Sequence, residues 1–134
     1  MKNAIVTGAS NGIGLEISKK LSENNYYVGM IDIDKENLLK ESENISNSVA
    51  IEGDVTNEDS IKNALDTFNK TPDLIVNNAG IVIFGGLEEQ SIEDFKKSVN
   101  VSLIGSYLVS RLAIDSMIKK GSGCIINMLS LIHI

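Results

Sequence analysis

Residues 7–14, Thr-Gly-Ala-Ser-Asn-Gly-Ile-Gly, decide the fold of this chain. They follow the apolar run Ala4–Thr7 and lead into the amphipathic run Ile13–Glu23, so they predict a turn between a buried strand and a helix. Glycine serves such a turn because it adopts positive φ and leaves space between the backbone and a bound pyrophosphate. The N-terminus of the following helix adds N–H groups and a positive dipole end. We interpret residues 7–14 as a phosphate-binding loop; the alternative is a plain turn.

Strand-like apolar runs alternate with amphipathic helical runs along the rest of the chain. This alternation is typical of parallel strands joined by right-handed helical crossovers, with helices on both faces of the sheet. We therefore predict an α/β fold: a Rossmann-type doubly wound parallel sheet, incomplete, with five strands in the order 3-2-1-4-5. The predicted strands are 4–7, 27–32, 49–51, 74–77 and 124–128, and the predicted helices are 13–23, 35–43, 57–69 and about 91–120, with Asn57 and Ser91 as N-caps.

Composition excludes several classes of protein. The chain has 134 residues, of which 43% are hydrophobic, and its net charge of −6 comes without any Lys/Arg run. These values predict one globular domain, and they argue against nucleic-acid and membrane partners. No apolar run reaches the length of a membrane span, and the N-terminus lacks the pattern of a signal peptide. A single cysteine, Cys124, excludes an internal disulfide, and nothing in the sequence points to a metal. We expect a cytoplasmic protein.

An acidic residue stands where a ribose would be recognised. Asp32 ends the second predicted strand, 18 residues after Gly14, close to the ~20 expected in dinucleotide-binding folds. A carboxylate there accepts hydrogen bonds from both ribose hydroxyls and repels a 2′-phosphate. Asn11 stands in the loop where a basic residue could bind that phosphate, and Lys35 is three residues beyond Asp32. The sequence therefore favours NAD over NADP, unless Asp32 merely begins the turn into the next helix.

Two motifs together resemble the short-chain dehydrogenase/reductase family. One is the loop Thr-Gly-x-x-x-Gly-x-Gly, and the other is Asn77-Asn78-Ala79-Gly80, which follows the fourth predicted strand. Three further positions agree with the family in order and spacing: Gly53-Asp54-Val55, Asn100 in the long helix, and Ile125-Ile126-Asn127 in the fifth strand. The resemblance extends over the chain as far as Met128.

The resemblance implies a cofactor-binding set drawn from several segments. The loop glycines would hold the pyrophosphate together with backbone amides of the loop. Asp54 would contact the adenine amino group with Val55 beside the ring, although Asp54 also suits an Asx turn. The Asn-Asn-Ala-Gly segment would pass beneath the adenosine ribose and pin the central strand. The full expected set is Gly8, Ser10, Asn11, Gly12, Ile13, Gly14, Asp32, Asp54, Val55, Asn77, Asn78, Ala79 and Gly80.

For catalysis, the resemblance implies a Tyr-x-x-x-Lys pair and a substrate-holding Ser after the fifth strand. Tyr107 has Arg111 four residues later, but this pair precedes the fifth strand, so we interpret both as ordinary helix residues. The chain is thus expected to be an N-terminal portion that stops before the catalytic pair. Asn100 resembles the helix Asn that bends the backbone and holds a water of the proton relay. Ser130, three residues after Asn127, is the candidate for the substrate-holding Ser.

The last six residues suggest a different origin. Leu-Ser-Leu-Ile-His-Ile at 129–134 is what the string CTGTCTCTTATACACATC encodes, a transposon end used in sequencing-library chemistry. We expect a native dinucleotide-binding portion over residues 1–128 and a non-native tail over 129–134. Ser130 would then match the family by coincidence and His133 would have no biological role. The alternative is a genuine early stop that leaves a relic or pseudoenzyme.

The resulting functional hypothesis is an NAD(P)-dependent oxidoreductase. The resemblance implies hydride transfer between nicotinamide and a secondary alcohol or ketone, in a parent enzyme that is a homodimer or homotetramer. A reductase of 3-oxoacyl groups on acyl carrier protein is an alternative within the family. A non-catalytic dinucleotide-binding module or pseudoenzyme remnant is the alternative from another class. The fragment itself is expected to be inactive.

Overall fold

The computed structural model of the chain describes residues 1–129. Its five strands form one parallel sheet in the order β3-β2-β1-β4-β5, which confirms the predicted doubly wound α/β fold. Predicted and observed strand bounds differ by at most two residues. The elements are β1 (Lys2–Thr7), α1 (Gly12–Glu23), β2 (Tyr26–Asp32), α2 (Lys35–Ser42), β3 (Ser48–Glu52), α3 (Glu58–Phe68), β4 (Leu74–Asn77), α4 (Ile92–Val99), the π-helical η1 (Asn100–Ile104), α5 (Gly105–Lys120) and β5 (Cys124–Asn127).

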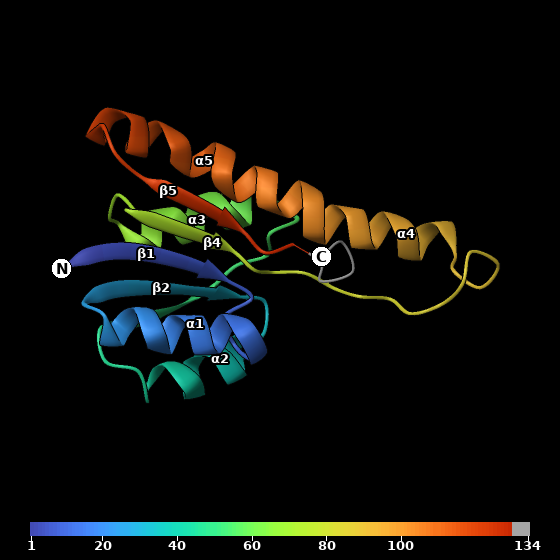
Figure 1. Cartoon of the computed structure of the whole chain (residues 1–134), viewed down its shortest axis with the longest axis horizontal. Coiled ribbons are helices and arrows are strands. Elements are labelled where there is room, and N and C mark those ends of the chain that lie inside the picture. The colour runs from blue at the N-terminus through green and yellow to red at the C-terminus, as the bar shows by residue number, and fades with distance from the viewer. Residues whose placement is uncertain (130–134) are drawn as a thin grey trace.

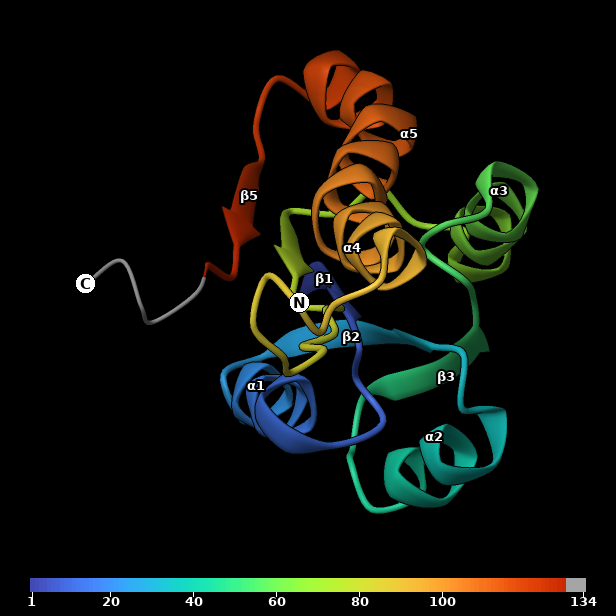
Figure 2. The ribbon, with the colours of Figure 1, turned by 90° about the vertical axis from the view of Figure 1, so that its right-hand side faces the viewer.

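Helices cover both faces of the sheet. Helices α1 and α2 lie on one face, and α3 and the long α4–η1–α5 helix lie on the other (Figures 1 and 2). Because successive strand side chains point to opposite faces, Ile5 of β1 joins the core beneath α3 and α5, whereas its neighbour Val6 joins the core beneath α1 and α2. Both side chains are fully buried, which explains why this strand reads as a continuous apolar run.

The order of the strands positions the candidate site. All five strands are parallel, so their carboxyl ends meet at one edge of the sheet. The chain crosses from β3 at one side back over to β4 on the other side of β1, and the strand order reverses between β1 and β4. In open α/β sheets the crevice outside the carboxyl ends at such a reversal is the usual place for a ligand.

The single helix expected over residues 91–120 contains an irregular turn. Its start is as predicted, because the Ser91 hydroxyl accepts from Asp94 N at 3.1 Å and the Asp94 carboxylate accepts from Ser91 N, a capping box. A π-helical segment then begins at Asn100 and ends before Gly105. Gly105 is buried against the α3 side of the sheet, where an added Cβ would lie 2.7 Å from Val55 Cγ2. Only glycine allows the helix to dock this closely on Val55.

The same helix bears on the expectation that the chain contains no membrane span. Helix Ile92–Lys120 is long and apolar enough, by length and composition, to cross a membrane, although no single apolar run in it is long. Its buried side chains have an explanation that needs no membrane. They fall at four-residue intervals on one face of α5, which packs against the core beneath α3; they are Gly105, Val109, Ala113 and Met117.

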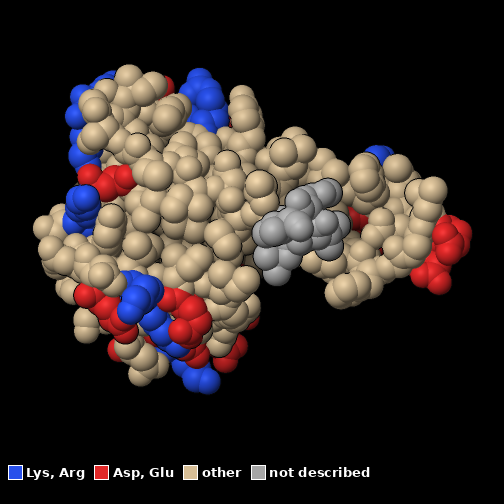
Figure 3. All heavy atoms as spheres, viewed as in Figure 1, with Lys and Arg blue, Asp and Glu red and all other residues tan. Residues whose placement is uncertain are grey.

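Charged side chains of both signs are mixed over the body of the molecule. Figure 3 shows Lys and Arg next to Asp and Glu below the sheet, and acidic side chains at the tip of the arm that α4 forms. Several of the cations are paired, as in Lys19–Glu16 at 2.8 Å and Lys20–Glu23 at 3.2 Å. On the body of the molecule, this view therefore shows cations and anions side by side.

Asp73 ties together the amino edge of the sheet, opposite the carboxyl ends. Its carboxylate accepts from Asn3 N at 2.8 Å and pairs with the Lys120 ammonium group. Its own N–H donates to Asn3 O at 2.7 Å, and its carbonyl accepts from Cys124 N at 2.9 Å. The Lys120 ammonium group, followed by the Asn3 N–H, lowers the pKa of Asp73 below its ordinary value of 3.8.

This lowered pKa leads to a pH-dependent contribution to stability. The unfolded carboxyl binds a proton near pH 3.8 while the folded one is still charged, so the stabilisation is complete above that pH and is lost as pH falls through the folded pKa. We expect Asp73→Asn to lower the free energy of unfolding at pH 7 by about 1 kcal/mol. Urea unfolding between about pH 7 and pH 2 should then give a flatter acid decline for the variant than for the wild type.

Asp66→Asn is the matched control, because Asp66 is exposed and makes no side-chain hydrogen bond or ion pair within residues 1–129. Parallel acid declines for Asp73→Asn and the wild type would show that Asp73 does not carry this dependence.

Candidate functional site

A cleft of about 460 Å³ opens at the carboxyl edge of the sheet, between the glycine loop and α4. It brings together segments that are distant in the sequence: the loop after β1, the ends of β2 and β3, the segment after β4, and one face of α4 and η1. The lining residues are Gly8, Asn11, Ile13, Ile31, Asp32, Ile33, Gly53, Asp54, Val55, Asn78, Ala79, Gly80, Ile81, Lys97 and Val101. Nine of the residues expected from the sequence are among them, whereas Ser10, Gly12, Gly14 and Asn77 are not.

Glycine serves a different structural purpose at each of the three positions in the loop. Gly8 and Gly12 have φ of +65° and +53°, the left-handed region that favours glycine. An added Cβ at Gly8 would lie 2.9 Å from Ala79 Cα, and one at Gly14 would lie 2.1 Å from Gly8 O. An added Cβ at Gly12 would meet no atom of residues 1–129 within 4 Å. Gly8 and Gly14 therefore permit close packing of the loop, and Gly12 leaves an open approach to its backbone.

Helix α1 directs its N-terminus toward this open approach. Its N-cap residue, Asn11, has an extended backbone and forms no capping hydrogen bond with its side chain, and the first turn carries no acidic residue. The first N–H groups of the helix therefore have no partner from a capping side chain. Unpaired N–H groups together with the positive end of the helix dipole suit an anion such as a phosphate.

Asp32 faces the glycine loop from the end of β2. Its Oδ2 accepts from Ser10 N and its Oδ1 accepts from Asp34 N, both at 3.0 Å. The side chain is half-buried and lines the cleft. Each carboxylate oxygen retains acceptor capacity, because it uses one of its lone pairs. Asp32 can therefore accept further hydrogen bonds from hydroxyl groups in the cleft.

Asp54 follows β3 and forms the Asx turn that the sequence suggested. Its Oδ1 accepts from Thr56 N at 2.8 Å and from Thr56 Oγ1 at 2.7 Å. Its Oδ2 makes no hydrogen bond within residues 1–129, and Asp54 lines the cleft. Val55, beside it, is buried against Gly105. One oxygen of Asp54 thus holds the turn while the other is left for a donor in the cleft.

The segment after β4 is held by the end of β1. The Thr7 hydroxyl accepts from Asn78 N at 3.1 Å and from Ala79 N at 3.0 Å. The Asn78 carboxamide in turn donates to the carbonyls of Thr7 and Gly8, each at 3.1 Å. Thr7 is a residue whose role the sequence did not reveal, since its partners lie more than 70 residues away. It fixes the cleft floor to the glycine loop.

Thr7 leads to a prediction about stability. Thr7→Val keeps the shape of this buried side chain but leaves the N–H groups of Asn78 and Ala79 without their acceptor. We expect the free energy of unfolding to fall by about 2 kcal/mol in urea titrations. Thr7→Ser retains the hydroxyl and should lose less than about 1 kcal/mol. Equal losses for the two variants would mean that the methyl group, rather than the hydroxyl, matters.

Asn77 performs a structural task behind the cleft. It is buried, and its Nδ2 donates to Asn127 Oδ1 at 2.8 Å and to Ser110 Oγ at 2.9 Å. These bonds join β4 to β5 and α5. Its Oδ1 is buried without a hydrogen-bond partner within residues 1–129. The ring of contacts supports the expectation that this position pins the central strand.

The residues expected to take part in catalysis are not assembled within residues 1–129. Asn100 begins η1, is exposed, and does not line the cleft. Ser102, two residues later, approaches the cleft floor, because its Oγ lies 3.5 Å from the position of a Cβ added at Gly80. Tyr107 is 65% exposed on α5. Ser130 and His133 lie outside the described residues, so the role of Asn100 and that of Ser130 stay predictions.

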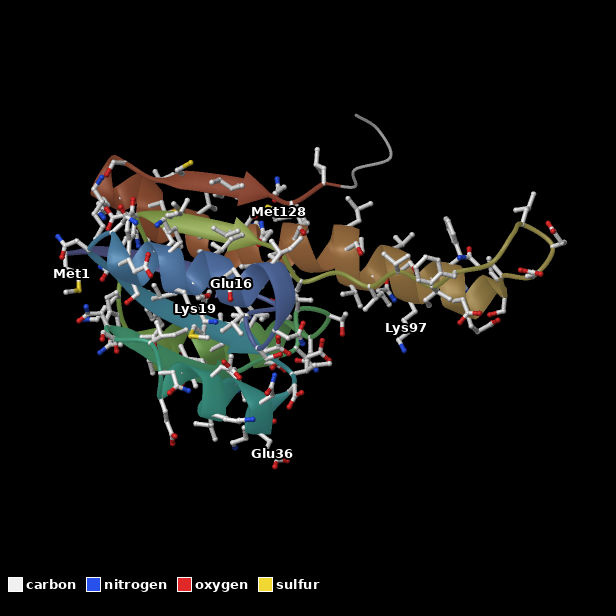
Figure 4. The ribbon with its side chains drawn as sticks, turned by 60° about the horizontal axis from the view of Figure 1, so that its bottom comes forward. Met1, Glu16, Lys19, Glu36, Lys97 and Met128 are labelled. Atoms are coloured by element: carbon white, nitrogen blue, oxygen red, sulfur yellow. The ribbon has the colours of Figure 1, made fainter. Side chains whose placement is uncertain are left out.

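Lys97 lines the cleft, although the sequence did not single it out. It projects from α4, on the arm beyond the body of the molecule (Figure 4), and lines the cleft together with Val101, one turn further along. Its ammonium group forms no ion pair within residues 1–129. Nothing in the local sequence distinguishes Lys97 from Lys96; only the docking of the helix on the sheet does.

Known proteins resemble this chain in sequence. The family model described as short chain dehydrogenase matches residues 2–133. The chain is 37% identical over 135 residues to an uncharacterized oxidoreductase of Thermotoga maritima, covering 96% of this chain and 53% of that protein. It is 34% identical to glucose 1-dehydrogenase 2 of Bacillus subtilis and 32% identical to an NAD-dependent glycerol dehydrogenase of Listeria innocua, covering 96% of this chain in both cases and 54% and 52% of the relatives.

The chain thus spans about half the length of the curated relatives that it matches. Those relatives are named as oxidoreductases, and the family match covers nearly the whole chain. With the parallel sheet and the glycine-lined cleft in place, these matches show that the chain belongs to the short chain dehydrogenase family.

Proposed function

We propose that this chain binds NAD in the cleft at the carboxyl edge of the sheet, and that the whole protein transfers hydride between NAD and a secondary alcohol or ketone. The observation that carries the proposal is Gly12. Its left-handed backbone and the open space around it lie at the uncapped N-terminus of α1. A pyrophosphate fits such a place because the backbone N–H groups can reach it without an intervening side chain.

The other groups of the cleft suit the remaining parts of the cofactor. Asp32 retains acceptor capacity for the ribose hydroxyls, and Asp54 Oδ2 is left for the amino group of adenine. Asn78, Ala79 and Gly80 form a floor that the Thr7 hydroxyl fixes in place. The bound nicotinamide would supply the hydride acceptor or donor. The described residues bind and orient the dinucleotide.

Two observations support NAD over NADP. Asp32 places a carboxylate at the end of β2, where it would repel a 2′-phosphate. Among the relatives, the Listeria innocua protein is named NAD-dependent. An alcohol as substrate is supported by the names of the glycerol and glucose dehydrogenases. A non-catalytic dinucleotide-binding module would use the same cleft, and activity of the whole protein distinguishes the two.

Calorimetric titration of the 134-residue chain with NAD, NADP and ADP-ribose tests the proposal. We expect NAD and ADP-ribose to bind, and NAD to bind at least about tenfold more tightly than NADP, because like-charge contact with Asp32 disfavours the phosphate. Circular dichroism of the same sample checks that the chain is folded. A folded chain that binds neither NAD nor ADP-ribose would refute the proposal, and tighter binding of NADP would refute its NAD preference.

We also propose that the whole protein associates with further copies of itself through the α4–α5 helix. The support is a set of large apolar side chains left exposed along it, among them Phe95, Leu103 and Tyr107. Light scattering of the whole protein should give a dimer or tetramer, and a monomer would contradict this assignment.

A further inference from the structure

Asn37 links helix α2 to the glycine loop. It lies in the first turn of α2, where its N–H donates to the Asp34 carboxylate at 3.1 Å, the hydrogen bond that caps this helix. Its side-chain Nδ2 donates to the Ser10 carbonyl at 2.7 Å, across 27 residues of sequence. The Asn37 side chain is half-buried. The first turn of α2 therefore holds the Ser10 carbonyl oxygen of the phosphate-binding loop.

The residue held by Asn37 also contacts the ribose-binding carboxylate. Ser10 is fully buried, and its N–H donates to Asp32 Oδ2 at 3.0 Å. Both backbone polar groups of Ser10 are thus held, the N–H by Asp32 and the carbonyl by Asn37. Gly12, with its open approach, follows two residues later. The hydrogen bond from Asn37 therefore helps to hold Ser10 beside Asp32, together with the bond from Ala9 N to Ile31 O at 3.3 Å.

This network also commits several of the donors near Asp32. A 2′-phosphate needs N–H donors or cations around it, whereas ribose hydroxyls need acceptors. Asp32, Asp34 and Glu36 place three carboxylates in this short stretch of chain. Four nearby donor groups already have an acceptor: Ser10 N and Asp34 N donate to Asp32, Asn37 Nδ2 donates to Ser10 O, and Lys35 Nζ pairs with Glu52 at 3.0 Å.

We infer that Asn37 is a positioning residue of the cofactor site, which holds Ser10 so that Asp32 meets an unphosphorylated adenosine ribose. The inference rests on the proposed binding of NAD. Asn37 acts through Ser10 and Asp32: its amide is committed to the loop carbonyl, and it is not among the residues that line the cleft.

The test measures ADP-ribose and NAD binding to the full chain by calorimetry. Asn37→Ala should weaken the binding of both ligands about five- to tenfold, which is the effect of losing one hydrogen bond that orders the site. Asn44→Ala is the matched control, because Asn44 Nδ2 likewise donates to a backbone carbonyl, that of Lys40 at 3.1 Å, beyond the other end of α2. It should leave both affinities within about twofold.

A double-mutant cycle separates positioning from a merely structural role. If Asn37 acts through Asp32, the effect of Asn37→Ala should shrink below about twofold in an Asp32→Ala background. Full additivity of the two substitutions would overturn the inference. Asn37→Asp replaces the donor by an acceptor at constant shape, and it serves as the second variant if the alanine variant does not fold.

Hydrogen exchange gives a readout without any ligand. The Ser10 amide should exchange about tenfold faster in Asn37→Ala, while amides of β1 should be unchanged. Wild-type chain that binds no ADP-ribose would refute the proposed function. Wild-type chain that binds it, with unchanged affinity and unchanged Ser10 exchange in both Asn37 variants, would refute the inference alone.

Discussion

The Gly14→Ala variant is expected to lose about 3 kcal/mol of folding free energy and to bind no nucleotide. A Cβ at this position would lie 2.1 Å from the Gly8 carbonyl oxygen and 2.5 Å from Asn78 Nδ2. The carbonyl belongs to the backbone of the loop, so it cannot rotate away, and α1 must shift from the loop instead. Alanine is the better helix former by about 1 kcal/mol, so intrinsic helix propensity would raise stability rather than lower it.

Gly12→Ala is the natural comparison for Gly14→Ala. Its Cβ enters open space, so only the left-handed backbone, at φ +53°, opposes the change, at a cost of about 1 kcal/mol. This variant should fold, yet its methyl group would occupy the approach to the loop and weaken NAD by about tenfold or more. Urea unfolding and calorimetry measure both properties. A Gly14→Ala chain as stable as the wild type would show that α1 does not pack on the loop as described.

The Asp32→Ala variant is expected to change the ratio of NAD to NADP affinity by about 100-fold. The affinity for NAD should fall about tenfold or more, since the hydrogen bonds from its ribose hydroxyls to a carboxylate are charge-assisted. The affinity for NADP should rise, because the negative charge that opposes its 2′-phosphate is removed. In the wild type the Ser10 and Asp34 N–H groups donate to Asp32, and in the variant they would become free to bind the phosphate.

Glu36→Gln is the control for the change of charge. Glu36 is an exposed acidic residue at the start of α2 (Figure 4), and it forms no ion pair within residues 1–129. The Glu36→Gln substitution removes one negative charge near the same end of the sheet. It should change the ratio of NAD to NADP affinity by less than about twofold. If Glu36→Gln shifted the ratio as much as Asp32→Ala, general electrostatics rather than contact with the ribose would explain the preference.

The parts of this site that depend on local geometry could be predicted from the sequence. Gly8, Gly12 and Asp32 were found because a turn between a strand and a helix, and the end of the following strand, leave a local pattern of residue types. The same holds for the capping box at Ser91 and for the alternation of strands and helices that predicted an α/β sheet. In each case the residue and its physical reason lie within a few positions of one another.

The parts that depend on tertiary contacts could not be predicted in this way. The Thr7 hydroxyl bonds to residues 71 and 72 positions away, and Asn37 reaches Ser10 across 27. The approach of Ser102 to Gly80 follows from how α4 and η1 dock on the sheet. The π-helical turn begins at Asn100, where the family resemblance implied a bend, whereas the apolar periodicity alone predicts a plain helix.

The pairing of β1 with β4 has a consequence for how the chain folds during its synthesis. β1 leaves the ribosome well before β4, its neighbour across the strand reversal, which begins at Leu74, the partner of Ala4. One edge of this central strand therefore stays unpaired until about 70 further residues have been made, and closing so long a loop is slow. Until then Ile5 and Val6 lack part of their covering, and β1 offers an unpaired edge. We expect nascent chains that stop before Asn77 to be recognised by chaperones, and chains that extend past it to be released.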